Sequence, residues 1–357
     1  MLPPMRIARV LLLTFALVLV AHAPAQAQEY FAYVASESAD EVSLIRFDGT
    51  EAVVQEAVPV GQIPVETEGA HGMTVSPDGE HWFVSIAHGK PFGRVVKYET
   101  GTNRKLEAAE VGLFPATMQI SDVTGLLYVV NFNLHGEPEP STVSVVETES
   151  MTEVQTIETG IMPHGSRLSP DHQKHYSVGM MDGTLYEIDV VSGEVSRTLK
   201  TGEGMTKPTW VQPHPSKPVA YVAHNGADEV VAVDLDAWKV TERFATGEGT
   251  SPYNLDVTPD GSTLVVTYKG SGETGIWDVE TGTRRALVEN TRGVSHGVVI
   301  TPDSRYAFVT AEGVGGEPGA VDVIDLSTGE KVAHADVGAQ AGGIAFWKMQ
   351  AGEAASR

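Results

Sequence analysis

The hydrophobic positions of the chain fall in short runs separated by turns, and this arrangement repeats. Residues 69–89 show the unit: an apolar run, the turn Ser76-Pro77-Asp78-Gly79, a second apolar run and a loop. Related turns start at Ser121, Ser169, Gln212, Thr258 and Thr301, which gives spacings of 45, 48, 43, 46 and 43 residues. A third apolar run and a more polar fourth run complete the unit. Four strands in roughly 45 residues, apolar inside and polar outside, predict one β-propeller blade per repeat.

The two ends of the chain each hold part of a further unit. Residues 30–34 and 42–47 look like a blade that starts at its second strand, and residues 342–347 look like a first strand with nothing after it. Joined, they make a seventh blade and remove the two free sheet edges of an open array. We therefore predict an all-β fold: a seven-bladed β-propeller over residues 28–350 with four strands per blade. The N- and C-terminal strands close the ring, and residues 351–357 form a disordered tail.

The first 27 residues have the three-part layout of a secretory signal peptide. Arg6 and Arg9 precede an apolar run of twelve residues, and Ala25-Gln26-Ala27 is a small-x-small cleavage site. The run is shorter than the roughly 20 residues that span a bilayer, and no later segment approaches that length. The chain has no cysteine, which excludes a lipid-anchored cysteine, disulfides and thiolate metal ligands. We expect a periplasmic or secreted protein with no membrane insertion.

The composition is strongly acidic. The formal charge is -23, and removing Arg6 and Arg9 with the signal peptide takes it to -25, because residues 1–27 contain no acid. Such a surface repels nucleic acid and anionic lipid and favours solubility. We therefore expect a monomer with no nucleic-acid partner. The acidity is better explained as a solubilising surface than as a functional patch.

The repeats resemble a known family. Tyr128-Val129-Val130-Asn131 and Tyr221-Val222-Ala223-His224 are similar to the second-strand signature of the YVTN propeller repeats, and the Pro-Asp-Gly turns also resemble them. That family includes the YncE-like periplasmic propellers. The resemblance covers essentially all of the chain after residue 27; it implies the seven-bladed fold and no particular activity. More distantly, the architecture resembles the propeller of nitrous oxide reductase, which carries a histidine-held copper cluster on its axis. This chain lacks that enzyme's cupredoxin domain and has no His-His pair.

Histidines gather at one predicted face of the ring. In a propeller, the start of each first strand and the end of each second strand open on the same mouth of the central channel. Six of the eleven histidines after residue 27 fall at these slots: His71, His88, His135, His164, His224 and His296. The other five fall in turns or outer strands, where we expect solvated side chains: His81, His172, His175, His214 and His334.

Imidazole is a good ligand for Cu, Zn, Fe and Ni, so the six histidines at the mouth are the predicted ligands of a transition metal. Glu312, Met180 or water would complete the site. The glycine that follows five of the six is expected to let the backbone turn sharply. His71, His164 and His296 are the firmest candidates, since they start first strands nearest the axis. In the alternative interpretation the imidazoles are structural and bond the backbone of a neighbouring blade.

Two functions stay open from the sequence. One is an exported binding protein whose His-rich mouth holds a metal ion and a small molecule. Its catalytic version would be a metal-dependent lyase or lactonase, with Glu312, Lys269 and Tyr253 as candidate acid and base groups. The other is a non-catalytic scaffold that binds a protein or a cell-envelope partner. Serine-elbow, calcium-loop, phosphate-loop and dinucleotide motifs are absent from the sequence.

Overall fold

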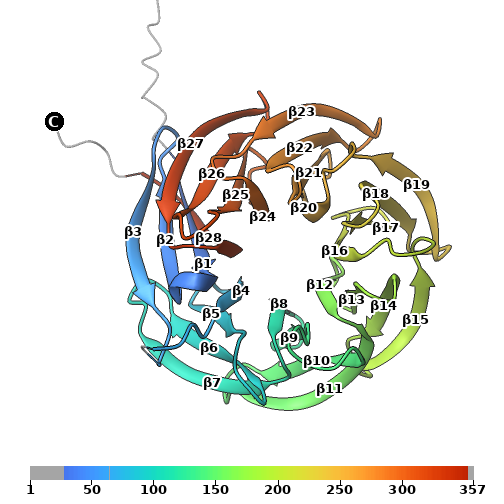
Figure 1. Cartoon of the computed structure of the whole chain (residues 1–357), viewed down its shortest axis with the longest axis horizontal. Coiled ribbons are helices and arrows are strands. Elements are labelled where there is room, and N and C mark those ends of the chain that lie inside the picture. The colour runs from blue at the N-terminus through green and yellow to red at the C-terminus, as the bar shows by residue number, and fades with distance from the viewer. Residues whose placement is uncertain (1–27, 64, 353–357) are drawn as a thin grey trace, which may run out of the picture.

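The chain forms a ring of seven four-stranded antiparallel sheets around a central axis (Figure 1). This computed structural model describes residues 28–63 and 65–352. Apart from one 3-10 turn, η1 (Glu37–Ala39), the regular elements of the described part are strands. The prediction of an all-β propeller with seven blades of four strands is confirmed.

In six blades the chain runs from an inner strand at the axis to an outer strand at the rim (Figure 1). The first three of these contain β4 (Ala70–Val75), β5 (His81–Ile86), β6 (Gly93–Glu99), β7 (Lys105–Val111); β8 (Pro115–Ile120), β9 (Leu126–Asn131), β10 (Pro140–Glu147), β11 (Thr152–Ile161); β12 (Pro163–Leu168), β13 (Lys174–Gly179), β14 (Thr184–Asp189), β15 (Glu194–Lys200). The next three contain β16 (Pro208–Pro213), β17 (Val219–His224), β18 (Glu229–Asp234), β19 (Lys239–Ala245); β20 (Pro252–Val257), β21 (Thr263–Tyr268), β22 (Glu273–Asp278), β23 (Thr283–Glu289); β24 (Val294–Ile300), β25 (Tyr306–Glu312), β26 (Gly319–Asp325), β27 (Glu330–Val337).

The seventh blade joins the two ends of the chain. β28 (Ala341–Ala351) is its inner strand, followed outward by β1 (Gln28–Ser36), β2 (Glu41–Phe47) and β3 (Ala52–Pro59). β1 and β28 pair antiparallel, from Gln28 opposite Ala351 to Ser36 opposite Ala341. Closure of the ring by both ends is therefore confirmed.

Apolar side chains of neighbouring blades interlock to form the core. Between the closing blade and the next one, Trp82 stacks on Tyr98 with ring centroids 4.0 Å apart and on Tyr33 at 5.2 Å. The Tyr33 hydroxyl and the Trp82 indole both donate hydrogen bonds to Asn103 Oδ1 at 3.0 Å. The buried polar ends of these rings are thus satisfied while their faces supply the packing area.

A bulge near the start of the inner strands shapes the channel lining. The register between β4 and β5 shifts between Ala70 and Met73, and equivalent shifts occur in the inner strands β8, β12, β16, β20 and β24. A bulge adds one residue and breaks the strict in-out alternation. Residues three positions apart, such as His164 and Arg167, therefore both line the channel.

Two histidines that we expected in solvent are buried. His175 on β13 is 0% exposed, stacks against Tyr128 at 5.0 Å between ring centroids, and has no hydrogen-bond partner on either ring nitrogen. His214 is buried after the end of β16, where its ring bonds the Gly261 carbonyl and two backbone amides. The prediction of solvated side chains is wrong for both. Both residues lie near turns, but nearness to a turn does not predict solvent exposure, because the face to which a side chain points decides its burial.

The predicted signal peptide (1–27) and most of the predicted tail lie outside the described residues, so these boundaries stay predictions. β28 continues to Ala351. In the described part, no helix is long and apolar enough to cross a membrane.

Candidate functional site

The residue that starts the bulge of each inner strand occupies an equivalent slot around the axis. Pairing places Ala70, Pro115, Pro163, Pro208, Pro252 and Ser295 opposite the ends of their neighbouring strands, and the next residue in each case starts the bulge. The slots hold His71, Ala116, His164, Thr209, Tyr253, His296 and, on β28, Gly342. Three imidazoles and one phenol therefore converge from four different blades.

The three imidazoles lie close together at the axis. The ring centroid of His71 is 5.7 Å from that of His296 and 6.3 Å from that of His164. Tyr253 lies against both partners, 5.1 Å from His164 and 4.8 Å from His296. The structure thus brings together the three histidines that the sequence favours most.

Hydrogen bonds fix the tautomer of His164. Its Nδ1 lies 3.0 Å from the carbonyl oxygen of Thr209, which can only accept, so Nδ1 carries the hydrogen. The Nε2 lone pair then accepts a hydrogen bond from the Tyr253 hydroxyl at 2.8 Å. Burial lowers the pKa of His164 to about 3, and the nearby His71 adds to this effect. His164 is therefore neutral near pH 7, with a lone pair at Nε2.

His71 is oriented by a carboxylate. Its Nδ1 lies 2.5 Å from Glu37 Oε2, and the other carboxylate oxygen is 2.9 Å from His88 Nε2. Burial opposes the charge on Glu37, but the interactions with His71 and His88 prevail and hold its pKa well below the ordinary value. Glu37 is thus an anion, and among the described residues His71 Nε2 is left as the ring nitrogen without a hydrogen-bond partner.

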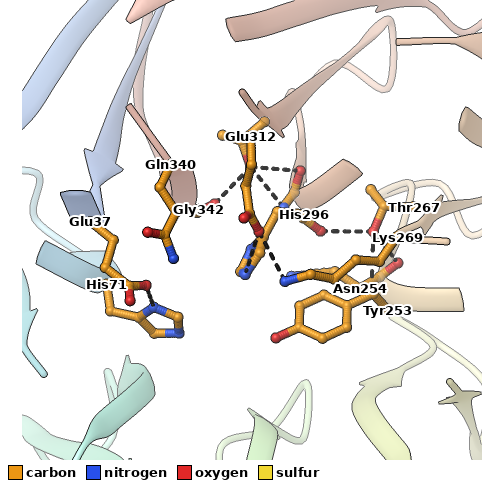
Figure 2. Close-up of polar contacts among 12 residues, drawn as sticks. Glu37, His71, Tyr253, Asn254, Thr267, Lys269, His296, Glu312, Gln340 and Gly342 are labelled. Atoms are coloured by element: carbon orange, nitrogen blue, oxygen red, sulfur yellow. Dashed lines mark hydrogen bonds and ion pairs between the residues drawn. The ribbon is translucent and has the colours of Figure 1, made fainter. Parts of the chain in front are cut away.

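His296 completes the group on the other side of the axis. Its Nδ1 is buried without a hydrogen-bond partner, and its Nε2 lies 3.7 Å from Glu312 Oε1. Lys269 Nζ bonds Glu312 at 2.9 Å and lies 4.4 Å from the centre of the Tyr253 ring. Burial lowers the pKa of His296 well below its usual range, reinforced by the Lys269 charge. Figure 2 shows this group facing the Glu37–His71 pair across the axis.

The remaining predicted ligands lie farther out. His88 and His135 lie at the mouth of the channel, with His88 Nδ1 2.9 Å from His135 Nε2. The hydrogen bond to Glu37 raises the pKa of His88. His224 does not line the axial cavity, and its two ring nitrogens bond Glu229 and Thr201, each at 2.9 Å. Met180 packs against the apolar cluster that contains Phe132 beside the mouth.

Glu37 was missed by the sequence analysis. It follows β1, the second strand of the closing blade, and therefore occupies the same kind of slot as His88 in the next blade. The six complete repeats predict the slots of six blades, whereas the slot of Glu37 belongs to the blade assembled from both chain ends. The repeat pattern therefore indicates Glu37 as a site residue once the closing blade is aligned with the others.

The glycines after the axial histidines do not mark sharp turns. Gly72 and Gly165 have no positive φ. A Cβ on Gly72 would lie 1.8 Å from the Ala116 carbonyl oxygen, and one on Gly165 would lie 2.4 Å from that of Thr209. These glycines instead allow the inner strands of neighbouring blades to approach closely.

A second group of candidate ligands lies at the opposite end of β4. Asp78, Glu80 and His81 have ligand atoms within 4.8 Å of one another in the exposed turn between β4 and β5. Asp78 already accepts hydrogen bonds there from the Ser76 hydroxyl and the Glu80 amide. Its position is explained by the turn.

A small cavity lies at the axis beside the histidines. It is lined by the three axial imidazoles and, farther along the channel, by Arg167, Trp210 and Asn254. Its free volume is about 30 Å³, which corresponds to about two water-sized positions. The site therefore has room for an ion and a very small ligand.

Fold and site together define a propeller protein with a buried, titratable pocket on its axis. The chain belongs to the YNCE-like beta-propeller family, whose model matches residues 129–346, more than half of the chain. The sequence matches no curated protein.

Several solved structures are similar in fold. Kuenenia stuttgartiensis hydrazine synthase aligns with a TM-score of 0.64 and 22% identity over 75% of this chain and 81% of that one. A candidate 6-phosphogluconolactonase from Bacteroides uniformis aligns with a TM-score of 0.69 and 16% identity over 89% and 99%. A functionally unknown protein from Desulfotomaculum acetoxidans aligns with a TM-score of 0.71 and 15% identity over 89% and 98%. At these identities the similarity concerns the fold alone.

Proposed function

We propose that this protein is an exported propeller that binds one transition-metal ion on its axis through His71, His164 and His296. The observation that carries the proposal is the convergence of three imidazoles, two of which have their Nδ1 atoms held by protein acceptors. Metal-binding histidines commonly donate the other ring N–H to a carboxylate or a carbonyl in this way. Glu37 and the Thr209 carbonyl are these two acceptors.

The spacing of the rings supports the same proposal. Metal–nitrogen bonds of about 2.0–2.1 Å around a tetrahedral ion place imidazole centroids roughly 5 Å apart. The centroids here are 5.7 and 6.3 Å from His71, and the ligand nitrogens of the three rings do not all lie within 4.8 Å of one another, so a bound ion would have to draw the rings closer together. Glu312 is the carboxylate beside His296 and is the proposed fourth ligand.

Charge also supports a cation here. Burial holds His164 and His296 in the neutral form that binds metals, and Glu37 and Glu312 supply negative charge beside them. A bound ion would act as a Lewis acid on an oxygen of a small ligand. Lys269 and Tyr253 are the proton-carrying groups nearest to such a ligand, which would suit a lyase or lactonase reaction.

Metal analysis of protein purified without a His tag tests the proposal. We expect about one Cu, Zn, Fe or Ni ion per chain, lost in His71→Ala and in His296→Ala. Glu37→Gln should weaken metal binding by about 10 to 100-fold, since it removes the carboxylate charge that orients His71 and leaves the three imidazoles in place. His334→Ala, which changes an exposed histidine on β27, is the matched control and should retain the ion.

The melting temperatures of the chelator-treated variants show whether each one folds. Wild-type protein should be stabilised by added metal, by about 2.7 kcal/mol when the free ion is at 100 times its dissociation constant. A metal-free wild type whose melting temperature does not change with any of the four ions would refute the proposal. That result would favour the scaffold function, in which the loops of the mouth bind a protein or a cell-envelope partner.

A further inference from the structure

Beyond the histidine layer, two residues that line the channel carry buried polar atoms without hydrogen-bond partners among the described residues. Trp210 and Asn254 are each 5% exposed and line the cavity. The Trp210 indole nitrogen and Asn254 Oδ1 are buried with no hydrogen-bond partner among the described residues, where no hydrogen bond from the Asn254 side-chain nitrogen is formed either. Burying such groups unpaired costs about 1–3 kcal/mol each. A buried site of this kind is explained when a ligand supplies the missing bonds.

Arg167 lines the same cavity. It follows His164 by three residues on β12, with the bulge of that strand between them. Its guanidinium stacks on Trp210, 4.4 Å from the ring centre. Its single hydrogen bond to the described part of the protein goes from Nη1 to the carbonyl oxygen of Ser166. A guanidinium has five N–H donors in a planar fork, so most of this fork has no protein partner.

The charge of Arg167 is not balanced by a contact ion pair in the described residues. The neighbouring carboxylate, Asp256, instead accepts hydrogen bonds from the backbone amides of Val257 and Ile300 at 2.9 and 3.0 Å. Burial lowers the pKa of Arg167 to about 10, and burial raises the pKa of Asp256 to about 6. The lowered pKa of Arg167 and the raised pKa of Asp256 have the same cause: the channel solvates a charged group less well than water does.

We propose that the channel contains an anion site in which Arg167, the Trp210 indole N–H and the Asn254 amide bind a small carboxylate or an oxoanion of similar size. The planar guanidinium matches the two oxygens of a carboxylate, and the indole adds a third donor. Because neither end of the Asn254 side-chain amide has a partner in the described part of the chain, its N–H end can face the anion. The cavity volume of about 30 Å³ restricts the ligand to a very small anion, such as formate.

This site is separate from the metal that we propose above, although both open into one cavity. The anion donors lie on β12, β16 and β20, and none of them is a proposed metal ligand. An anion bound there would lie between the guanidinium and an ion at the histidines. The anion would therefore lie where a small-molecule substrate of the proposed metal site would bind.

Formate titration of chelator-treated protein tests the anion site, with tryptophan fluorescence as the readout. Sodium formate is compared with sodium chloride at constant ionic strength, so that screening cancels. We expect a saturable fluorescence change with formate only, and its absence in Trp210→Phe. Arg167→Gln should weaken formate binding at least tenfold. Arg197→Gln is the matched control, because Arg197 also stacks on a tryptophan, Trp238, but pairs with Glu187 outside the channel.

Asn254→Ser provides a second variant in case Arg167→Gln does not fold. The Asn254 side chain makes no hydrogen bond to residues 28–63 or 65–352, so its truncation should leave the melting temperature nearly unchanged and weaken formate binding several-fold. Equal responses to formate and chloride, or wild-type formate affinity in Arg167→Gln, would overturn the anion site. Chelator-treated protein that binds formate but takes up no metal would retain this site and refute only the metal proposal.

Discussion

Replacing His175 with phenylalanine should remove part of the acid sensitivity of the propeller. His175 is 0% exposed, and neither ring nitrogen has a hydrogen-bond partner. Burial lowers its pKa to about 3, and the charge of Arg167 acts in the same direction. The folded protein therefore holds this imidazole neutral at any pH above about 3, while the unfolded chain protonates it below about 6.5.

The direction of the effect follows from proton linkage. Between pH 6.5 and 3 the unfolded state binds one more proton at this residue than the folded state, so stability rises with pH in that window. The destabilisation is nearly zero at pH 7.5. It grows by about 1.4 kcal/mol for each pH unit below 6.5 and reaches about 2 kcal/mol at pH 5.0.

Urea unfolding of wild type and His175→Phe at pH 7.5 and pH 5.0, with a chelator present, measures this contribution. Phenylalanine is larger than histidine, and overpacking costs about 1–3 kcal/mol, so the stability difference at a single pH is not decisive. The packing cost is the same at both pH values and cancels when the two differences are compared. We expect the variant to gain about 2 kcal/mol relative to wild type on going from pH 7.5 to pH 5.0.

The buried histidines His164 and His296 remain in both proteins, so their contributions also cancel. His334→Gln, at an exposed position on β27, should show the same pH dependence as wild type. If the stability difference between wild type and His175→Phe is equal at the two pH values, the reasoning is wrong. The folded protein would then accept a proton at His175 without cost.

Two further predictions concern the ring. Truncation after Val337 removes β28 and leaves the edge of β1 unpaired, so we expect no cooperative thermal transition by circular dichroism; a near-wild-type melt would contradict closure by both chain ends. Gly72→Ala would place a Cβ 1.8 Å from a carbonyl oxygen on β8, and we expect a loss of about 3 kcal/mol in urea unfolding. Gly293→Ala, where a Cβ meets nothing within 4 Å, is the control, and equal stabilities for these two variants would show that the inner strands are not packed as described.

The fold could be predicted from the sequence because a propeller repeats one local solution. Each blade has a related turn and a related alternation of apolar residues, so each repeat gives independent support for the same prediction. The two incomplete units at the chain ends could be paired because an open ring would expose sheet edges. The same logic predicted the convergence of His71, His164 and His296, since these residues hold one slot in three blades.

Other parts of the site depend on contacts that a repeat does not encode. Glu37 lies in the one blade that the chain assembles from both ends, and its role comes from its distance to His71 and His88. His224 does not line the axial cavity, and its ring nitrogens bond Glu229 and Thr201. The partnerless Trp210 and Asn254 are recognisable only when the neighbours of each polar atom are known.

Comparison of the seven equivalent slots shows whether the blade fold itself requires the axial histidines. β8, β16 and β28 form the same inner strand with Ala116, Thr209 and Gly342 in the slot, so the blade does not require an imidazole there. Only His164 bonds the backbone of a neighbouring blade, as the structural interpretation expects. His71 bonds a carboxylate and His296 leaves Nδ1 unpaired. Burying these groups lowers stability, and a ligand on the axis would offset that cost.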